Sequence, residues 1–234
     1  MAWLLPTLNR AEKLKNFIDS AIAAETTTPG LILIDQDDWN ANESSYKKLP
    51  IIPGWQYRIT QGVTMGDKVR EVWNEVESRN WVGILNDDHY VVTKHWDVKM
   101  LAKLDGKNFV SANDRWCAPR KATTATLWSM DLLKCLGWPI FPPGLHHLYI
   151  DDLWENLGRH TGCWRPVMSV VVEHHHVYAG KGAMDSTHEK VYSSKAWDID
   201  TATFQNFMKH DFQEAVNKIK KFQDILPGQR FKPP

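Results

Sequence analysis

Residues 81–85 and the four that follow them constrain the fold more than any other part of the chain. The run Trp-Val-Gly-Ile-Leu predicts a strand that is buried on both faces, as in the parallel sheet of an α/β protein. It ends abruptly in Asn86, Asp87, Asp88 and His89. Ligands of open α/β sheets bind beyond the carboxyl ends of the strands. Carboxylates at such a place suit a divalent cation and the phosphates that it carries.

The side chains of this cluster should not all face one way. Alternation along a strand would place Asn86 and Asp88 on one face and direct Asp87 elsewhere. A solvated acidic turn is the alternative interpretation, because two acids after a strand are common in loops.

The first ninety residues alternate between strand and helix patterns. Strands are predicted at residues 2–5, 31–34, 57–59 and 81–85, with Pro6 stopping the first. Asn9 and Glu12 predict a capping box at the start of one helix, and apolar spacing predicts a second helix at residues 69–76. The order predicts a mostly parallel, Rossmann-like α/β sheet flanked by helices.

The second half of the chain is less regular. Strands are predicted at residues 109–112, 125–129 and 167–172, and helices at residues 130–136, 151–157 and 203–226. Residues 140–144 and 178–189 are predicted to be loops, the latter mobile. The domain prediction is one α/β domain over residues 1–200, a C-terminal amphipathic helix over 201–226 packed on it, and a flexible tail over 227–234.

Composition excludes several classes of protein. Lys and Arg number 28, as do Asp and Glu, and this balance argues against strong non-specific binding to nucleic acid or to an anionic membrane. Cys117, Cys135 and Cys163 lack metal-ligand spacing, which favours free thiols in a reducing compartment. No signal peptide or long apolar segment is evident, so we expect a soluble cytoplasmic protein with no membrane partner. The 12 Trp fit either a core or a stacking surface for a sugar or base.

Three further polar clusters could carry chemistry. Asp35, with Asp37 and Asp38 after it, ends the second strand and could accept a hydrogen bond from a base or ribose, although Asp also caps turns. The pair Asp151-Asp152 could supply a general base for an acceptor hydroxyl, although at least one of the two is expected to cap a helix.

The third cluster is a run of histidines at a strand end. Alternation would place His174 and His176 on one face, where either could ligate Mn²⁺. Lys181, in the glycine-containing segment after them, could fold over a diphosphate, and an ordinary surface loop is the alternative.

The order of these segments resembles the GT-A type of nucleotide-sugar-dependent glycosyltransferase. Residues 6–10 (Pro-Thr-Leu-Asn-Arg) resemble that family's segment after the first strand, and Asp35 matches its base-contacting acid. Asn86-Asp87-Asp88 resembles its Asp-x-Asp motif, and the later acidic pair and histidines are similar to its base and metal ligand. The resemblance covers roughly residues 2–190 and depends on order and spacing.

The resemblance implies a role for each cluster. The family would bind a nucleoside-diphosphate sugar, with a UDP-sugar favoured, through Pro6, Thr7, Arg10, Asp35, Asn86, Asp87 and Lys181. Asp88 with His176 or His174 would hold Mn²⁺ or Mg²⁺. Asp151 or Asp152 would deprotonate the acceptor in an inverting reaction. Two departures stand out: Asn86 replaces the first acid of the motif, and residues 67–70 replace an expected basic residue and Asn.

Other functions stay open at this stage. A nucleotidyltransferase has a similar sheet but usually a glycine-rich loop after the first strand, and residues 5–13 contain no glycine. A non-catalytic nucleotide-sugar or glycan-binding protein is a second alternative, favoured by Asn86. Residues 174–187 are also similar to a segment of small bacteriophage glycosyltransferases. That likeness would place the protein in a host cytoplasm and would make a modified DNA base a candidate acceptor.

Overall fold

The structure is a computed structural model that describes residues 2–118 and 125–224. Strands and helices alternate through the first part of the chain, in the order β1 (Ala2–Thr7), α1 (Ala11–Ala23), β2 (Gly30–Asp35), α2 (Gln36–Tyr46), β3 (Trp55–Thr60), α3 (Met65–Glu71), α4 (Trp73–Val76) and β4 (Trp81–Ile84). The remaining elements are β5 (His89–Val91), α5 (Trp96–Leu101), β6 (Phe109–Asn113), β7 (Thr126–Ser129), α6 (Met130–Leu136), α7 (Ile150–Thr161), β8 (Trp164–His174), the 3₁₀ turn η1 (Val177–Ala179), α8 (Ser186–Val191), α9 (Ser194–His210) and α10 (Phe212–Gln223).

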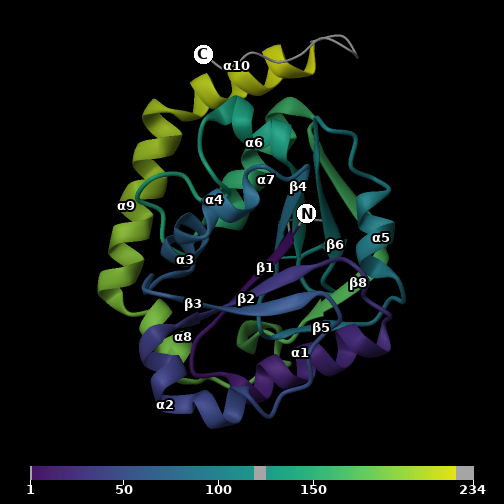
Figure 1. Ribbon diagram of the computed structural model, residues 1–234. Coiled ribbons are helices and arrows are strands. Elements are labelled where there is room, and N and C mark those ends of the chain that lie inside the picture. The colour runs from purple at the N-terminus through teal and green to yellow at the C-terminus, as the bar shows by residue number, and fades with distance from the viewer. Residues whose placement is uncertain (1, 119–124, 225–234) are drawn as a thin grey trace.

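These strands form a curled sheet in the order β3-β2-β1-β4-β7-β6-β8-β5. Strands β3, β2, β1 and β4 are parallel neighbours, as are β6 and β8. Strand β7 runs antiparallel to β4 and β6, and β5 runs antiparallel to β8. The predicted α/β class, with a mostly parallel sheet flanked by helices, is confirmed (Figure 1).

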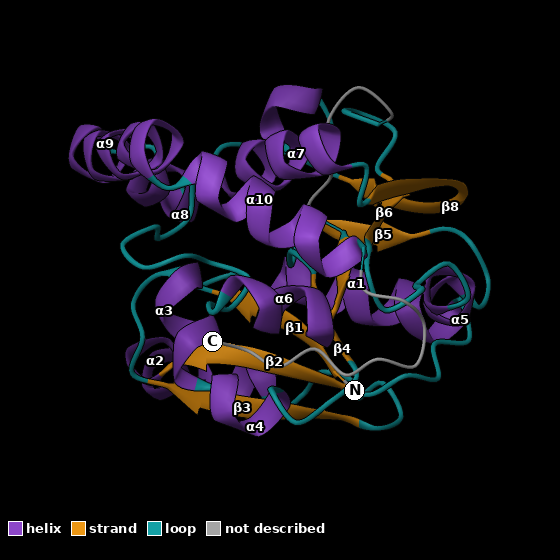
Figure 2. Cartoon of the chain, turned by 90° about the horizontal axis from the view of Figure 1, so that it is seen from above, coloured by secondary structure: helices purple, strands orange, loops and turns teal. Residues whose placement is uncertain are grey.

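Alternating residues of the central strands build two cores, one on each side of the sheet. Leu4 of β1 packs with residues of α3, α4, α6, α7 and α10. Trp3 and Leu5 pack on the other side with residues of α1 and α5. Figures 1 and 2 show α1 and α10 on opposite sides of the strands. Gly83 of β4 lies beside Trp3 in the register, and a Cβ there would meet the indole at 2.2 Å, so only glycine fits.

Two predictions about the start of the chain are wrong. Strand β1 runs through Pro6 to Thr7, because β4 pairs with β1 only as far as Leu4 and the missing N–H of Pro6 breaks no ladder there. The predicted capping box also fails: Asn9 has φ of 54°, and Arg10 is the N-cap of α1 without a side-chain hydrogen bond.

Two of the predicted helices are each divided in the structure. Residues 69–76 span α3 and α4, which meet at Val72, and the C-terminal helix is interrupted at Asp211, with its first part beginning at Ser194. Apolar spacing continues across each break because both halves pack on the same core, so the pattern did not reveal the break. The predicted end of the last helix and the tail at 227–234 lie outside the described residues.

Other elements were not predicted. Helix α2, strand β5 and helix α5 occupy segments without a clear period, and the predicted loop at 178–189 contains most of η1 and the start of α8. Asp185 caps α8 by accepting a hydrogen bond from the His188 N–H, which stabilises a helix too short to form alone.

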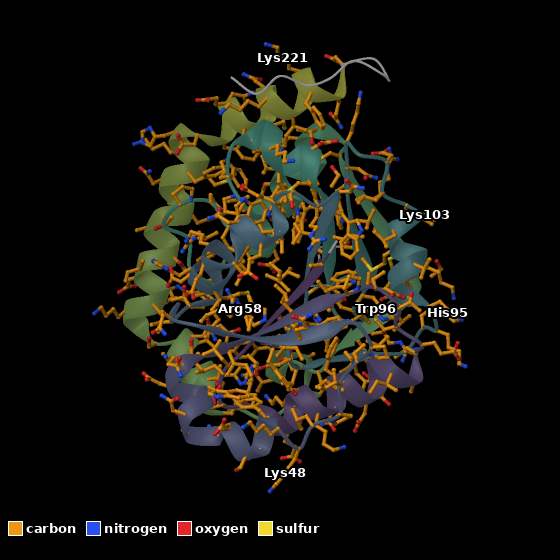
Figure 3. The ribbon with its side chains drawn as sticks, in the orientation of Figure 1. Lys48, Arg58, His95, Trp96, Lys103 and Lys221 are labelled. Carbon is orange, nitrogen blue, oxygen red and sulfur yellow. The ribbon has the colours of Figure 1, made fainter. Side chains whose placement is uncertain are left out.

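The molecular surface carries most of the charge. Lys48, Lys103 and Lys221 extend outward at the rim of the molecule (Figure 3).

Cys135 and Cys163 are free and buried, and burial raises the pKa of the Cys135 thiol to about 12. None of the helices in the described part of the chain combines the length and hydrophobicity needed to cross a bilayer.

Candidate active site

The carboxyl ends of β1 and β4 bring Thr7, Arg10 and Asp87 together. The Thr7 hydroxyl donates to Asp87 Oδ2 at 2.7 Å, and Arg10 Nη1 donates to Asp87 Oδ1 at 3.1 Å. Asp87 is 3% exposed, so its charge is balanced inside the protein. Burial raises the pKa of Asp87, Arg10 opposes this shift and the charge of Asp88 adds to it.

Asp88 turns to a different partner. Strand β4 ends at Ile84, so strand alternation does not extend to the acids, and β5 begins at His89 and pairs it with His174 of β8. This pairing places Asp88 Oδ1 3.0 Å from His174 Nε2, with both residues buried. Burial alone would raise the pKa of Asp88, but the hydrogen bond and charge of His174 hold it well below its usual range.

His176 lies just beyond β8 and is also buried. Its Nδ1 accepts a hydrogen bond from the Tyr178 N–H at 3.2 Å, and its Nε2 is 3.2 Å from the Tyr192 hydroxyl. The ring stacks on Trp116, with centroids 4.9 Å apart. Burial lowers the pKa of His176 to about 4, so the imidazole is neutral at pH 7 and one ring nitrogen has a lone pair that can ligate a metal.

A cavity of about 290 Å³ opens beside these groups. Asp35, Lys181 and His174 do not line it, but the other residues predicted to bind the nucleotide sugar or the metal do, namely Pro6, Thr7, Arg10, Asn86, Asp87, Asp88 and His176. Lys68 and Lys190 add positive charge to this lining. We call this space the first cavity.

An ion pair with Lys68 explains why Asp35 does not line the first cavity. The Lys68 ammonium donates to the Thr7 carbonyl at 2.7 Å and forms an ion pair with Asp35 Oδ1 at 3.2 Å. Asp35 therefore supports the wall of the first cavity through Lys68. Lys181 lines neither cavity described here and donates to Glu173 at 2.6 Å.

A second cavity of about 460 Å³ adjoins the first. The two share Met65, Asn86, His147, His176 and Tyr192 as lining residues. Asp151 and Asp152 line only the second cavity, as does His174. Neither aspartate caps α7 as predicted, because Tyr149 is the N-cap, with φ of 63° and no side-chain hydrogen bond.

Asp200 of α9 positions the segment that separates the two cavities. Its carboxylate accepts hydrogen bonds from the backbone N–H groups of His146, His147 and Leu148 at 2.7 to 2.9 Å, and it is 2% exposed. Burial lowers the pKa of His147 to about 4, which leaves this ring neutral at pH 7.

Sequence reasoning did not identify Lys68, His147, Tyr192 or Asp200 as site residues. The basic residues at 68 and 70 were the only available signal, and they were read as a departure from the family pattern.

The donor atoms of this site fit a divalent cation. The 3.0 Å between Asp88 Oδ1 and His174 Nε2 matches the separation of adjacent ligands around an octahedral ion with bonds of about 2.1 Å. No group of three His, Cys, Asp or Glu side chains within residues 2–118 and 125–224 is arranged to hold a metal. Two protein ligands, with phosphate oxygens and water filling the other positions, are typical of Mg²⁺ bound with a nucleotide.

Comparisons with known proteins identify the fold. No family model and no curated protein matches the sequence. The structure does resemble solved structures, among them TarS 1–349 from S. aureus, with a TM-score of 0.51, 11% identity, and coverage of 93% of this chain and 79% of that one.

Two further structures were determined with nucleotides. Glucosyl-3-phosphoglycerate synthase from Mycobacterium tuberculosis, in complex with Mg²⁺ and UDP, has a TM-score of 0.54, 12% identity, and coverage of 86% of this chain and 78% of that one. The mannosyltransferase PcManGT from Pyrobaculum calidifontis, in complex with GDP-Man and Mn²⁺, has a TM-score of 0.52, 11% identity, and coverage of 94% and 72%. The chain therefore has the GT-A fold of these glycosyltransferases.

Proposed function

We propose that the protein is a metal-dependent glycosyltransferase that moves a sugar from a nucleoside-diphosphate donor to an acceptor hydroxyl. One observation carries the proposal. The buried contact between Asp88 and His174 lies where a cavity with basic lining residues meets a cavity that contains an acidic pair. A donor and an acceptor held in adjoining cavities would meet beside this contact.

The first cavity is suited to the donor. Arg10, Lys68 and Lys190 provide positive charge for a diphosphate, and Thr7 and Asn86 provide polar groups for the nucleoside. The glucosyl-3-phosphoglycerate synthase was solved with UDP and the mannosyltransferase with GDP-Man, which supports a nucleoside diphosphate in this cavity. We favour a UDP-sugar.

Asp88 and His174 would hold Mn²⁺ or Mg²⁺, with His176 as a further ligand once its lone pair is released from the Tyr178 N–H. A bound divalent cation would offset the charge that develops on the departing diphosphate.

Asp151 or Asp152 would act as the general base. Its carboxylate would take the proton from the acceptor hydroxyl, and that oxygen would form a bond to the anomeric carbon of the sugar. The bond from that carbon to the diphosphate oxygen would break, and the nucleoside diphosphate would leave with the electron pair. Attack opposite the leaving group inverts the anomeric configuration.

The first experiment measures donor hydrolysis and transfer with a panel of nucleotide sugars and Mn²⁺. We expect turnover with one donor, and loss of at least 100-fold in kcat for Asp151→Asn or Asp152→Asn with little change in donor Kd. Asp198→Asn is the matched control, because this aspartate is exposed on α9 and lines neither cavity. Folded protein that binds no nucleotide sugar would contradict the proposal.

A non-catalytic binding protein is the second candidate, and Asn86 in place of the expected acid favours it. Asp88→Asn separates the two functions. With this change an enzyme should lose its turnover, whereas a binding protein should keep its ligand. A modified DNA base as the acceptor stays a prediction from the sequence.

A further inference from the structure

A carboxylate occupies two basic side chains at the start of α1. Arg10 donates to both oxygens of Asp185 through Nε and Nη2, and Lys13 donates to one of them, at distances of 2.6 to 3.0 Å. Arg10 Nη1 is engaged by Asp87 at 3.1 Å. The Arg10 side chain is 11% exposed, so its Nε–Nη2 edge can bind another anion only after Asp185 leaves it.

This arrangement has the geometry with which proteins bind phosphate. A guanidinium uses two parallel N–H groups to bind the oxygens of either a carboxylate or a phosphate, and an ammonium beside it adds a point charge. Arg10 Nε and Lys13 Nζ share one oxygen of Asp185, so the two basic groups are adjacent. Asp185 therefore presents to them the pair of anionic oxygens that a phosphate would present.

The arrangement lies at the border of the first cavity. Arg10 lines that cavity, as do Thr187 and His188, which follow Asp185 in the chain. Asp185 is not a lining residue, and it meets the lining through Arg10 and its own helix. A diphosphate in the first cavity would thus compete with Asp185 for the guanidinium of Arg10.

Asp185 is placed so that it can withdraw. Its side chain is 28% exposed, so water can solvate the carboxylate once Arg10 leaves it. Residues 181–184, which lead into α8, are all exposed, and Gly180 before them has φ of 70°, a conformation that glycine adopts readily. The carboxylate also accepts a hydrogen bond from the His188 N–H at 3.0 Å, and this cap does not depend on Arg10.

We propose that Arg10 and Lys13 form a phosphate subsite, which Asp185 fills in the free protein and the diphosphate of the donor takes over. The contact with Asp185 is then autoinhibitory, since the phosphate binds only when the carboxylate releases Arg10. The inference rests on the proposed function, because it describes how the phosphates of that donor are held. If Asp185 served only to position Arg10, its removal would weaken phosphate binding instead of strengthening it.

The test compares the wild type with Asp185→Asn, which keeps the helix cap and removes the charge. Calorimetry with Mg²⁺ present would measure the Kd of inorganic pyrophosphate and of UDP. Saturation-transfer NMR would measure the Kd of uridine, which has no phosphate. We expect the variant to bind pyrophosphate and UDP about fivefold more tightly, because more of the free protein has an open subsite, and to bind uridine as the wild type does.

Matched variants separate this contact from the overall charge of the protein. Asp19→Asn removes the exposed partner of Lys15 on the same helix and should leave all three Kd values unchanged. Lys13→Gln, added to Asp185→Asn, should cancel most of the gain, whereas Lys15→Gln, added in the same way, should not. Circular dichroism and thermal melting would verify that every variant is folded.

Four results would overturn the inference. These are no tighter binding of pyrophosphate by Asp185→Asn, an equal gain for uridine, an equal gain in Asp19→Asn, and failure of pyrophosphate to bind either protein. Tighter binding of pyrophosphate without transfer from any nucleotide sugar would instead contradict the proposed function and leave the phosphate subsite standing.

Discussion

Asp185 holds Arg10, a lining residue of the first cavity, in a two-pronged ion pair. Arg10 Nε and Nη2 donate to the two carboxylate oxygens at 3.0 and 2.7 Å, and Lys13 donates to Oδ2 at 2.6 Å. The contact joins the start of α1 to the N-terminus of α8. Helix α8 contributes His188 and Lys190 to the first cavity, so this ion pair positions part of the lining of that cavity.

Asp185→Asn should loosen α8 without abolishing its cap, because asparagine caps helices as well as aspartate does. We expect faster amide hydrogen exchange in residues 186–191 and a loss of about 1 kcal/mol in the free energy of unfolding. Asp19→Asn is the control, since it removes an ion pair to Lys15 whose side chains are about half exposed. If both variants behave alike, the Arg10 contact does not hold α8.

The contribution of Asp185 to stability should depend on pH. Burial would raise the pKa of Asp185, but hydrogen bonds from Arg10 and Lys13 outweigh it and lower this pKa well below its usual range. A depressed pKa in the folded state stabilises the protein above the unfolded pKa of about 3.9, and this stabilisation declines as the pH falls below that value. Denaturant unfolding of the wild type and Asp185→Asn should therefore differ more at pH 7 than at pH 3. A constant difference would contradict the assignment.

Asp200→Ala should disrupt the segment between the cavities. Three backbone N–H groups would lose a charged acceptor, and we expect a loss of about 3 kcal/mol in the free energy of unfolding. Donor binding should weaken as well, because His146 and His147 line the first cavity. Asp198→Ala, on the exposed face of the same helix, should change the free energy by less than about 0.5 kcal/mol. Chemical denaturation and calorimetry would measure both quantities.

Lys68→Met should be strongly destabilising. The change would leave Asp35, with a side chain 12% exposed, without its cation, and would cost about 3 kcal/mol in the free energy of unfolding. Adding Asp35→Asn to Lys68→Met should recover part of this loss, since the uncompensated charge is then removed. Lys47→Met, which breaks an exposed pair with Glu43, serves as the control. A double variant less stable than Lys68→Met alone would contradict this account.

The sequence by itself determined the class of fold and the edge of the sheet at which polar groups meet. Strands with dense apolar runs must be buried inside the sheet. The polar residues at the ends of β4 and β8 therefore lie at an edge of the sheet, whichever way the helices pack on its faces. The cluster around Asp88 and the histidines could be predicted for this reason. The broken helices could not, because the same apolar spacing fits a continuous helix and two helices that share a core.

Only the tertiary structure decided which partners the charged residues have. Asp185 and Arg10 are separated by 175 positions, and Asp200 binds backbone N–H groups, which carry no side-chain signature in the sequence. Three aromatic residues that line the second cavity also come together only through the chain path, since Trp116, Tyr178 and Trp197 belong to three separate segments. Periodicity reports which face of an element is buried, whereas a cavity depends on how distant segments pack against one another.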